Sequence, residues 1–149
     1  NLKNEFDNFI IIGKNNKWLY KEIKNNFLNN QISLEYFEWV ENIESFFNPL
    51  TDIHLFPLSA GTGTKNRVLM SQKNNCLWIG SKITFENIEP FFVSGSGLIY
   101  KSYEDLSLYL LNIRKYHASF MRITKNDLDQ ALKLRDKKFS SQIKYFFLK

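Results

Sequence analysis

The spacing of apolar residues in the first third of the chain predicts a strand followed by an amphipathic helix. Residues 9–12 form an unbroken apolar run that ends at Gly13, a pattern typical of a short buried strand. Apolar residues then recur every three to four positions from Trp18 to Leu28. This spacing places them on one helical face, so we expect a helix that packs against the strand.

The next apolar repeat predicts a second helix that carries an acidic face. Apolar residues continue at helical spacing from Leu34 to Phe47, with Ser33 as the N-cap and Pro49 as a stop signal. The carboxylates of this helix would lie away from its apolar stripe. If 34–39 were a strand instead, the chain would open with a strand–helix–strand unit of the Rossmann type. The acidic residues of the predicted helix are Glu35, Glu38, Glu41 and Glu44.

The rest of the chain favours short strands and capped helices. The two asparagines at 74–75 are typical of a hairpin turn between strands. Ser102 with Asp105, and Thr124 with Asp127, have the spacing of capping boxes at helix N-termini. The predicted strands of this part are 53–58, 67–71, 76–80, 91–93, 98–100 and 120–123.

These elements together predict one α+β domain over residues 1–149, with a mainly antiparallel sheet and helices packed on it. A length of 149 residues suits one domain, and 44% hydrophobic residues suffice for a core. The alternative is an α/β domain of the Rossmann type. Gly13 is the only glycine of the opening segment, so the three-glycine dinucleotide fingerprint is absent.

Cysteine content and hydropathy indicate a cytoplasmic protein that does not bind a membrane. The single cysteine, Cys76, excludes an intrachain disulfide, which fits a reducing compartment. The longest apolar runs are far shorter than the roughly 20 residues of a membrane-spanning helix. The first seven residues are polar and acidic, unlike those of a signal peptide.

The net charge of +5 is unevenly distributed along the chain. Residues 1–75 carry 8 basic and 8 acidic side chains, so the excess lies in the second half. An acidic middle and a basic end favour charged partners. The predicted acidic face would bind a basic protein, and the end of the chain an acidic one. Aromatic residues near that end make RNA an alternative partner. The basic residues predicted to bind are Arg135, Lys137 and Lys138.

The glycine-rich segment from Gly61 to Lys65 is the strongest candidate for ligand chemistry. Two glycines leave backbone amides accessible, and a lysine can meet a phosphate. The spacing is not that of a P-loop, and we expect a strand rather than a helix after it. The two histidines and Cys76 lack the spacing of a metal site. We therefore predict no catalytic residue, metal or cofactor.

Residues 55–113 combine a glycine turn at Gly61 and Gly63, short strands, a hairpin over 68–79 and a capped helix from Ser102. This order of features resembles the SMI1/KNR4, or SUKH, immunity proteins. The resemblance implies an α+β domain that binds and neutralises a toxin without catalysis.

These observations lead to three hypotheses about function. The first is a non-enzymatic immunity or antitoxin protein that covers a cognate toxin through charge and a few aromatic residues. The second is a nucleotide- or phosphate-binding enzyme or sensor that uses the Gly61–Lys65 segment. The third is an RNA-binding accessory protein.

Overall fold

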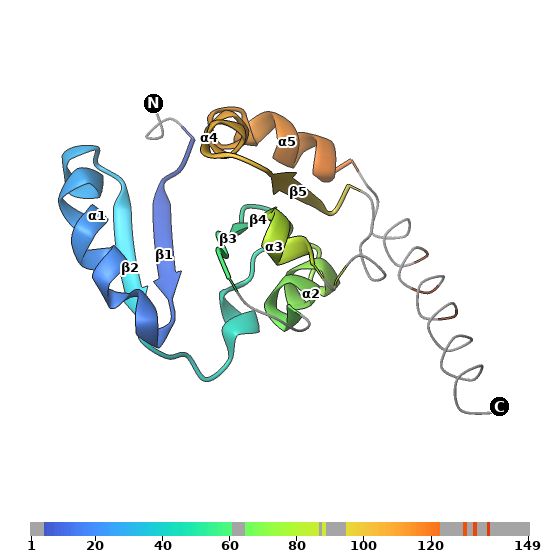
Figure 1. Ribbon diagram of the computed structural model, residues 1–149, viewed down its shortest axis with the longest axis horizontal. Coiled ribbons are helices and arrows are strands. Elements are labelled where there is room, and N and C mark those ends of the chain that lie inside the picture. The colour runs from blue at the N-terminus through green and yellow to red at the C-terminus, as the bar shows by residue number, and fades with distance from the viewer. Residues whose placement is uncertain are drawn as a thin grey trace.

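The computed structural model describes residues 5–60, 65–86, 88 and 95–122, together with the helical positions 130, 133 and 137. Helices and strands alternate along this part of the chain (Figure 1). Two 3₁₀ helices, η2 (Lys14–Asn16) and η3 (Ile43–Phe46), lie in the first third. The other elements are β1 (Asn8–Ile12), α1 (Lys17–Asn29), β2 (Ser33–Phe37), β3 (Ile53–Phe56), α2 (Asn66–Lys73), β4 (Leu77–Ser81), α3 (Lys82–Phe85), β5 (Gly97–Tyr100), α4 (Tyr103–Leu111) and α5 (Ile113–Phe120).

All described strands pair in parallel, so the predicted antiparallel sheet is wrong. β1 pairs with β2, and β4 lies between β3 and β5 in a second sheet. A parallel pair needs a crossover rather than a hairpin. Helices α1 and α2 supply two such crossovers, and α3 lies on the third. The architecture is therefore α/β, as in the Rossmann-type alternative.

The segment 33–37 is strand β2, and the predicted helix over 33–47 is wrong. Leu34 and Tyr36 lie opposite Phe9 and Ile11 in the register of the parallel pair. The chain then continues without helix until the short η3. A short apolar run is compatible with both the helical and the strand period. Here the segment is a strand because it pairs with β1.

The segment 67–71 is part of helix α2 and not a strand. Val68, Ser71 and Gln72 are buried at the three- and four-residue spacing of a helix face. The turn at 74–75 joins α2 to β4, and Asn75 adopts a positive φ of 57° there. The predicted hairpin is therefore replaced by a strand–helix–strand unit.

Other predictions had mixed outcomes. The helix after β1, the strands at β3, β4 and β5, and the N-cap at Ser102 are confirmed. The predicted strand 120–123 is wrong as far as it is described, because Phe120 ends helix α5 and residues 121–122 form a turn. The predicted strand 91–93 and the capping box of Thr124 and Asp127 lie outside the described residues.

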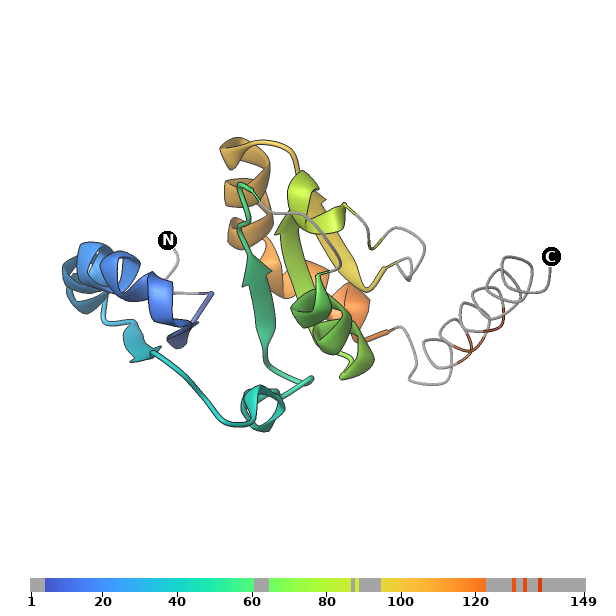
Figure 2. The same cartoon turned by 60° about the horizontal axis from the view of Figure 1, so that its bottom comes forward.

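Strand β4 is buried on both faces. Leu77 and Ile79 face a core built with α4 and α5, to which Ile113 and Phe120 contribute. Trp78 faces the other side, where it packs with Val68 of α2 and with residues of α3 and β5. Figure 2 shows the two helical layers on opposite faces of the three-stranded sheet. This double burial is typical of the central strand of a parallel sheet.

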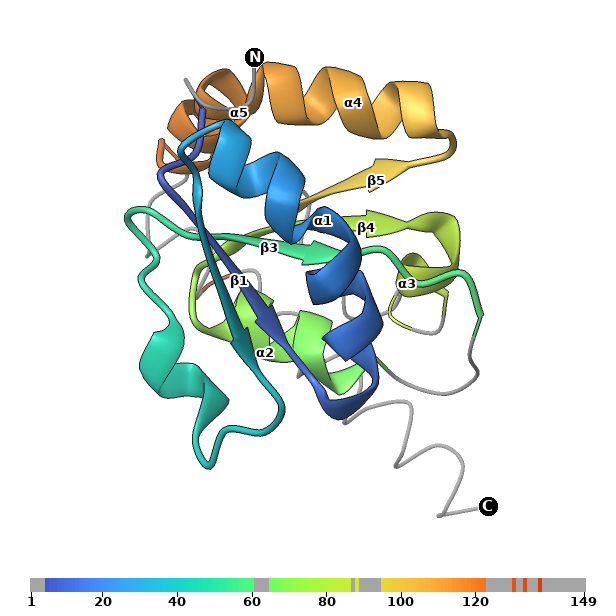
Figure 3. The ribbon, with the colours of Figure 1, turned by 90° about the vertical axis from the view of Figure 1, so that its left-hand side faces the viewer.

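The strands β1 and β2 form a two-stranded sheet that is separate from the three-stranded sheet β3-β4-β5. Figure 3 shows β1 and β2 running across the direction of β3, β4 and β5, with α1 packed on the two-stranded sheet. In open α/β sheets, ligands bind outside the carboxyl ends of the strands.

Candidate functional site

Two glycine-containing segments follow the carboxyl ends of strands, one in each sheet. The first is the turn from β1 into α1, which starts at Gly13. The second joins β3 to α2 and contains the glycine-rich residues 61–64, which lie outside the described residues. Its two described ends, Pro57 and Lys65, show where this connection leaves β3 and enters α2.

Two hydroxyl groups hold the start of the β3–α2 connection. Thr84 Oγ1 donates to the Phe56 carbonyl oxygen at 2.6 Å, and Ser81 Oγ donates to the Leu58 carbonyl oxygen at 2.5 Å. The Ser81 hydroxyl also accepts from the Thr84 N–H at 3.1 Å and caps α3. Ser81 at the end of β4 and Thr84 in α3 therefore anchor the end of β3 and fix the direction in which the chain leaves it.

Thr84 also determines which residue can occupy position 80. A Cβ atom added to Gly80 would lie 2.6 Å from Thr84 Cγ2 and 3.2 Å from the Trp78 ring. Only glycine lets α3 pack this closely on β4, because any side chain would overlap the threonine. The hydroxyl anchor and the glycine therefore depend on each other.

The N-terminus of α2 carries two basic side chains. Lys65 is the N-cap residue and Arg67 is the second residue of the helix, while the first turn holds no acid. No side chain among the described residues caps this helix. The helix dipole adds partial positive charge at the same end. An anion is the ligand that these charges and the exposed N–H groups attract.

The β1–α1 turn is held by hydrogen bonds with residues of β2. Gly13 adopts a φ of 134°, which favours glycine, and its N–H donates to the Phe37 carbonyl at 2.9 Å. The Tyr36 hydroxyl donates to the Gly13 carbonyl at 3.2 Å. Tyr36 also stacks on Tyr20 of α1, with ring centroids 5.6 Å apart. Burial, followed by the charge of Glu38, raises the pKa of Tyr36, so its hydroxyl stays protonated as a donor.

The four acids of the predicted helix do not share one face. Glu35 lies in β2 and accepts from Asn8 Nδ2 at 2.8 Å. Glu38 and Glu41 lie in the segment after β2, and Glu44 is in the first turn of η3. Of the predicted basic residues, Lys137 is exposed and helical, whereas Arg135 and Lys138 lie outside the described residues. A partner-binding role of these residues stays a prediction.

The remaining chemically active side chains gather at the opposite edge of the sheet. His54 Nδ1 lies 2.6 Å from the Ser71 hydroxyl, and the His54 ring packs against Phe47 with centroids 4.3 Å apart. Ser71 is fully buried and therefore cannot attack a substrate. Burial raises the pKa of Cys76 to about 11, so the thiol is protonated and unreactive at neutral pH. This cluster links β3 to α2 and serves packing.

Sequence reasoning missed two kinds of residue in the site. The hydroxyls of Ser81 and Thr84 follow a strand at N-cap spacing, a signal that predicts a cap but not the contacts with β3. Arg67 was assigned to a strand, which hid its place at a helix N-terminus. Lys65 was recognised, because it ends the glycine-rich segment that starts at Gly61.

Comparisons with protein-family models, curated proteins and solved structures gave no match. No helix in the described part of the chain is long and apolar enough to cross a membrane. Among the same residues, no three His, Cys, Asp or Glu side chains are grouped so that they could hold a metal ion. The site must therefore be interpreted from its own geometry.

Proposed function

We propose that this protein binds the phosphate groups of a nucleotide at the N-terminus of α2, at the carboxyl edge of the three-stranded sheet. The observation that carries the proposal is the start of α2. Two cations, Lys65 and Arg67, occupy a helix N-terminus with no acid in its first turn. Gly61 and Gly63 precede that N-terminus in the sequence, and the helix follows the carboxyl end of β3 in a parallel sheet.

The charges at this helix start are unfavourable to the helix dipole. A cation near a helix N-terminus opposes the dipole, at a cost of about 0.3–1 kcal/mol each. An N-cap other than Ser, Thr, Asp or Asn costs roughly a further 1 kcal/mol. A bound phosphate would reverse both effects, since its oxygens accept from the free N–H groups and neutralise the side chains.

The presence of α2 also removes the main objection to phosphate binding at the glycine-rich segment. A strand after Lys65 would point its amides sideways into a sheet ladder. A helix after Lys65 aligns its first N–H groups toward the preceding connection instead. The spacing still differs from that of a P-loop, so the expected ligand contacts are backbone amides and two cations rather than that motif.

A binding experiment with matched lysine variants tests the proposal. Pyrophosphate and nucleoside diphosphates should bind the wild-type protein and raise its Tm. Lys65→Ala and Arg67→Ala should each weaken binding about tenfold or more, because each removes a charge-assisted contact. Lys73→Ala, at the far end of the same helix, is the control and should bind like wild type. Equal affinity in all four proteins, or no binding, would contradict the proposal.

A toxin-binding function is a second proposal, favoured by the exposure of Glu38 and Glu41 next to the exposed Trp39. Acids around one accessible aromatic residue suit a basic protein partner. Glu38→Lys with Glu41→Lys should then slow association with that partner. Unchanged association would exclude this surface.

A further inference from the structure

Helix α1 carries a row of lysines on the face that it does not use for packing. Lys17 and Lys21 are four residues apart, and Lys24 follows three residues later, so the three side chains are neighbours along one side of the helix. All three are exposed. Like charges at this spacing repel each other, so this lysine row is unfavourable to the helix itself.

The opposite face of α1 packs on the two-stranded sheet. Phe27 lies against Phe9 of β1 with ring centroids 5.2 Å apart, and Tyr20 stacks on Tyr36 of β2 with centroids 5.6 Å apart. Figures 1 and 2 show α1 on the outer side of β1 and β2, away from β3, β4 and β5. The lysine row is therefore on the outside of the molecule, where a large partner can reach it.

No acid pairs with the lysine row within the described part of the chain, where none of the three lysines forms an ion pair. Glu22, the one acid of α1, lies about 100° around the helix from Lys21. Lys24 lies over the Tyr20 ring instead, with Nζ 5.6 Å from the ring centroid. The first turn of α1 holds no acid, so the helix dipole adds positive charge near Lys17. A partner with closely spaced negative charges complements this face.

Two exposed apolar side chains border the lysine row. Trp18 is 67% exposed and precedes Lys21 by three residues, while Leu28 is 60% exposed and follows Lys24 by four. Residues at these spacings are neighbours on a helix surface, so each apolar side chain lies beside a lysine. An exposed indole offers a flat face on which another ring can stack. The outer face of α1 thus combines a row of cations with one stacking surface.

The composition of this surface distinguishes between anionic partners. A helix that binds a membrane buries a wide apolar face in the lipid, but the apolar face of α1 already packs on β1 and β2. An acidic peptide would match the lysines and leave Trp18 unused. A nucleic-acid duplex keeps its bases stacked inside. A single strand supplies both a row of phosphates and accessible base rings, so it uses every feature of the surface.

We propose that the outer face of α1 binds a single-stranded nucleic acid, with Lys17, Lys21 and Lys24 along the phosphates and one base stacked on Trp18. The contacts are with phosphates and with the face of a base, so binding should depend strongly on salt and only weakly on base sequence. This inference does not depend on the phosphate site proposed at α2, which uses other residues.

Titrations with uridine RNA and thymidine DNA of about 12 nucleotides test the inference. At least one of these single strands should bind and quench tryptophan fluorescence. The logarithm of the association constant should fall with the logarithm of salt concentration with a slope of about −2, as for three phosphate contacts. Lys21→Ala with Lys24→Ala should weaken binding about tenfold or more and bring the slope to about −0.7. Trp18→Leu should weaken binding about tenfold and remove the quenching, whereas Trp18→Phe should keep most of the affinity.

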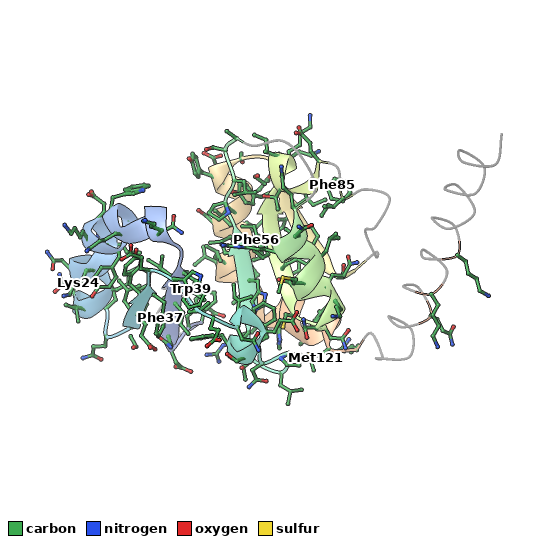
Figure 4. All side chains as sticks on the ribbon, turned by 90° about the horizontal axis from the view of Figure 1, so that it is seen from below. Lys24, Phe37, Trp39, Phe56, Phe85 and Met121 are labelled. Carbon is green, nitrogen blue, oxygen red and sulfur yellow. The ribbon has the colours of Figure 1, made fainter. Side chains whose placement is uncertain are left out.

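Matched control variants change the same residue types elsewhere. Lys73→Ala with Lys82→Ala removes the same net charge from α2 and α3 and should bind like wild type. Figure 4 shows Lys24 on the outer side of the unit formed by β1, α1 and β2, and Trp39 on its side toward Phe56 of β3. Trp39→Leu therefore removes an exposed indole away from the lysine row and should also bind like wild type. The replaced side chains are all exposed, so each variant should keep the wild-type Tm.

Several outcomes would overturn the proposal. Equal losses of affinity in the two double lysine variants would assign binding to overall charge. Unchanged affinity in Trp18→Leu, or a DNA duplex that binds as tightly as the single strands, would exclude the stacked base. Binding of polyglutamate or of phosphatidylglycerol vesicles in place of the oligonucleotides would identify another partner, and binding of none of these probes would exclude the surface.

Discussion

Helices α2 and α4 both begin at the carboxyl edge of the three-stranded sheet, but their first turns differ. Ser102 caps α4 by accepting from the Asp105 N–H at 3.2 Å, and Asp105 accepts from the Lys101 N–H at 3.0 Å. Hydrogen bonds from its own N–H and from Ser102 lower the pKa of Glu104 in the same turn. At α2, Lys65 and the residues after it supply neither a cap nor an acid.

This difference is what the proposed phosphate site rests on. The first turn of α4 is capped by its own side chains and carries negative charge that complements the dipole. The first turn of α2 has the opposite charge, and its Val68 and Leu69 N–H groups donate to the Lys65 carbonyl. If the proposed function holds, α4 contributes stability at this sheet edge and α2 contributes binding.

The largest expected effect comes from replacing the basic start of α2 by acidic residues, as in the first turn of α4. Replacing Lys65 and Arg67 together by Asp should abolish pyrophosphate binding, with a loss of at least about 100-fold. The same change should raise the free energy of unfolding by about 1 kcal/mol, since it adds a cap and acids at the N-terminus. Calorimetric titration and urea denaturation measure the two effects. A double variant that is less stable than wild type would show that the cations hold α2 by themselves.

Removal of the Thr84 hydroxyl, at the start of α3, should have the next largest effect. Thr84→Val keeps the shape of the side chain but leaves the Phe56 carbonyl without this hydrogen bond. The free energy of unfolding should fall by about 1–3 kcal/mol. The start of the β3–α2 connection should loosen, so pyrophosphate affinity should fall several-fold. Thr84→Ser, which keeps the hydroxyl, is the control and should retain most of the affinity. Equal losses in both variants would assign the effect to packing.

Loss of the cap at α4 should change stability alone. Ser102→Ala should lower the free energy of unfolding by about 1 kcal/mol and leave pyrophosphate affinity as in wild type. Ser102→Thr should restore most of the stability. Weaker binding in Ser102→Ala, at a temperature where it is folded, would mean that the two helix starts are not independent.

The smallest expected effect is a pH dependence of stability that arises from His54, which contacts Ser71 of α2. Burial lowers the pKa of His54 below its ordinary 6.5, although the charge of Asp52 opposes this. The unfolded chain then binds more protons than the folded protein, so the stability contributed by neutral His54 should be lost as the pH falls below about 6.5. His54→Gln should flatten this part of the stability curve in urea denaturation between pH 5 and 8. An unchanged curve would assign the acid sensitivity to other groups.

Local signals along the chain explain which predictions were confirmed. The helix α1 is long enough for its period to be unambiguous, and the cap of α4 needs only Ser102 and Asp105, three residues apart. Strand β4 is an apolar run next to a turn. Glu35 shows the limit, because its segment has a helical spacing of apolar residues and still forms a strand. The segment around Arg67 shows the reverse error, because it was predicted as a strand and forms helix α2.

The sequence by itself determined the amphipathic helix after the first strand, the apolar strands β3, β4 and β5, the start of α4 and the glycine-rich segment before Lys65. Only the tertiary structure decided that β2 is a strand, that α2 is a helix and that every described pair is parallel. The physical reason is that the deciding contacts join residues that are far apart in the sequence. Phe9 pairs with Leu34, and Thr84 bonds to Phe56, across about 25 residues each, and no local period encodes those contacts.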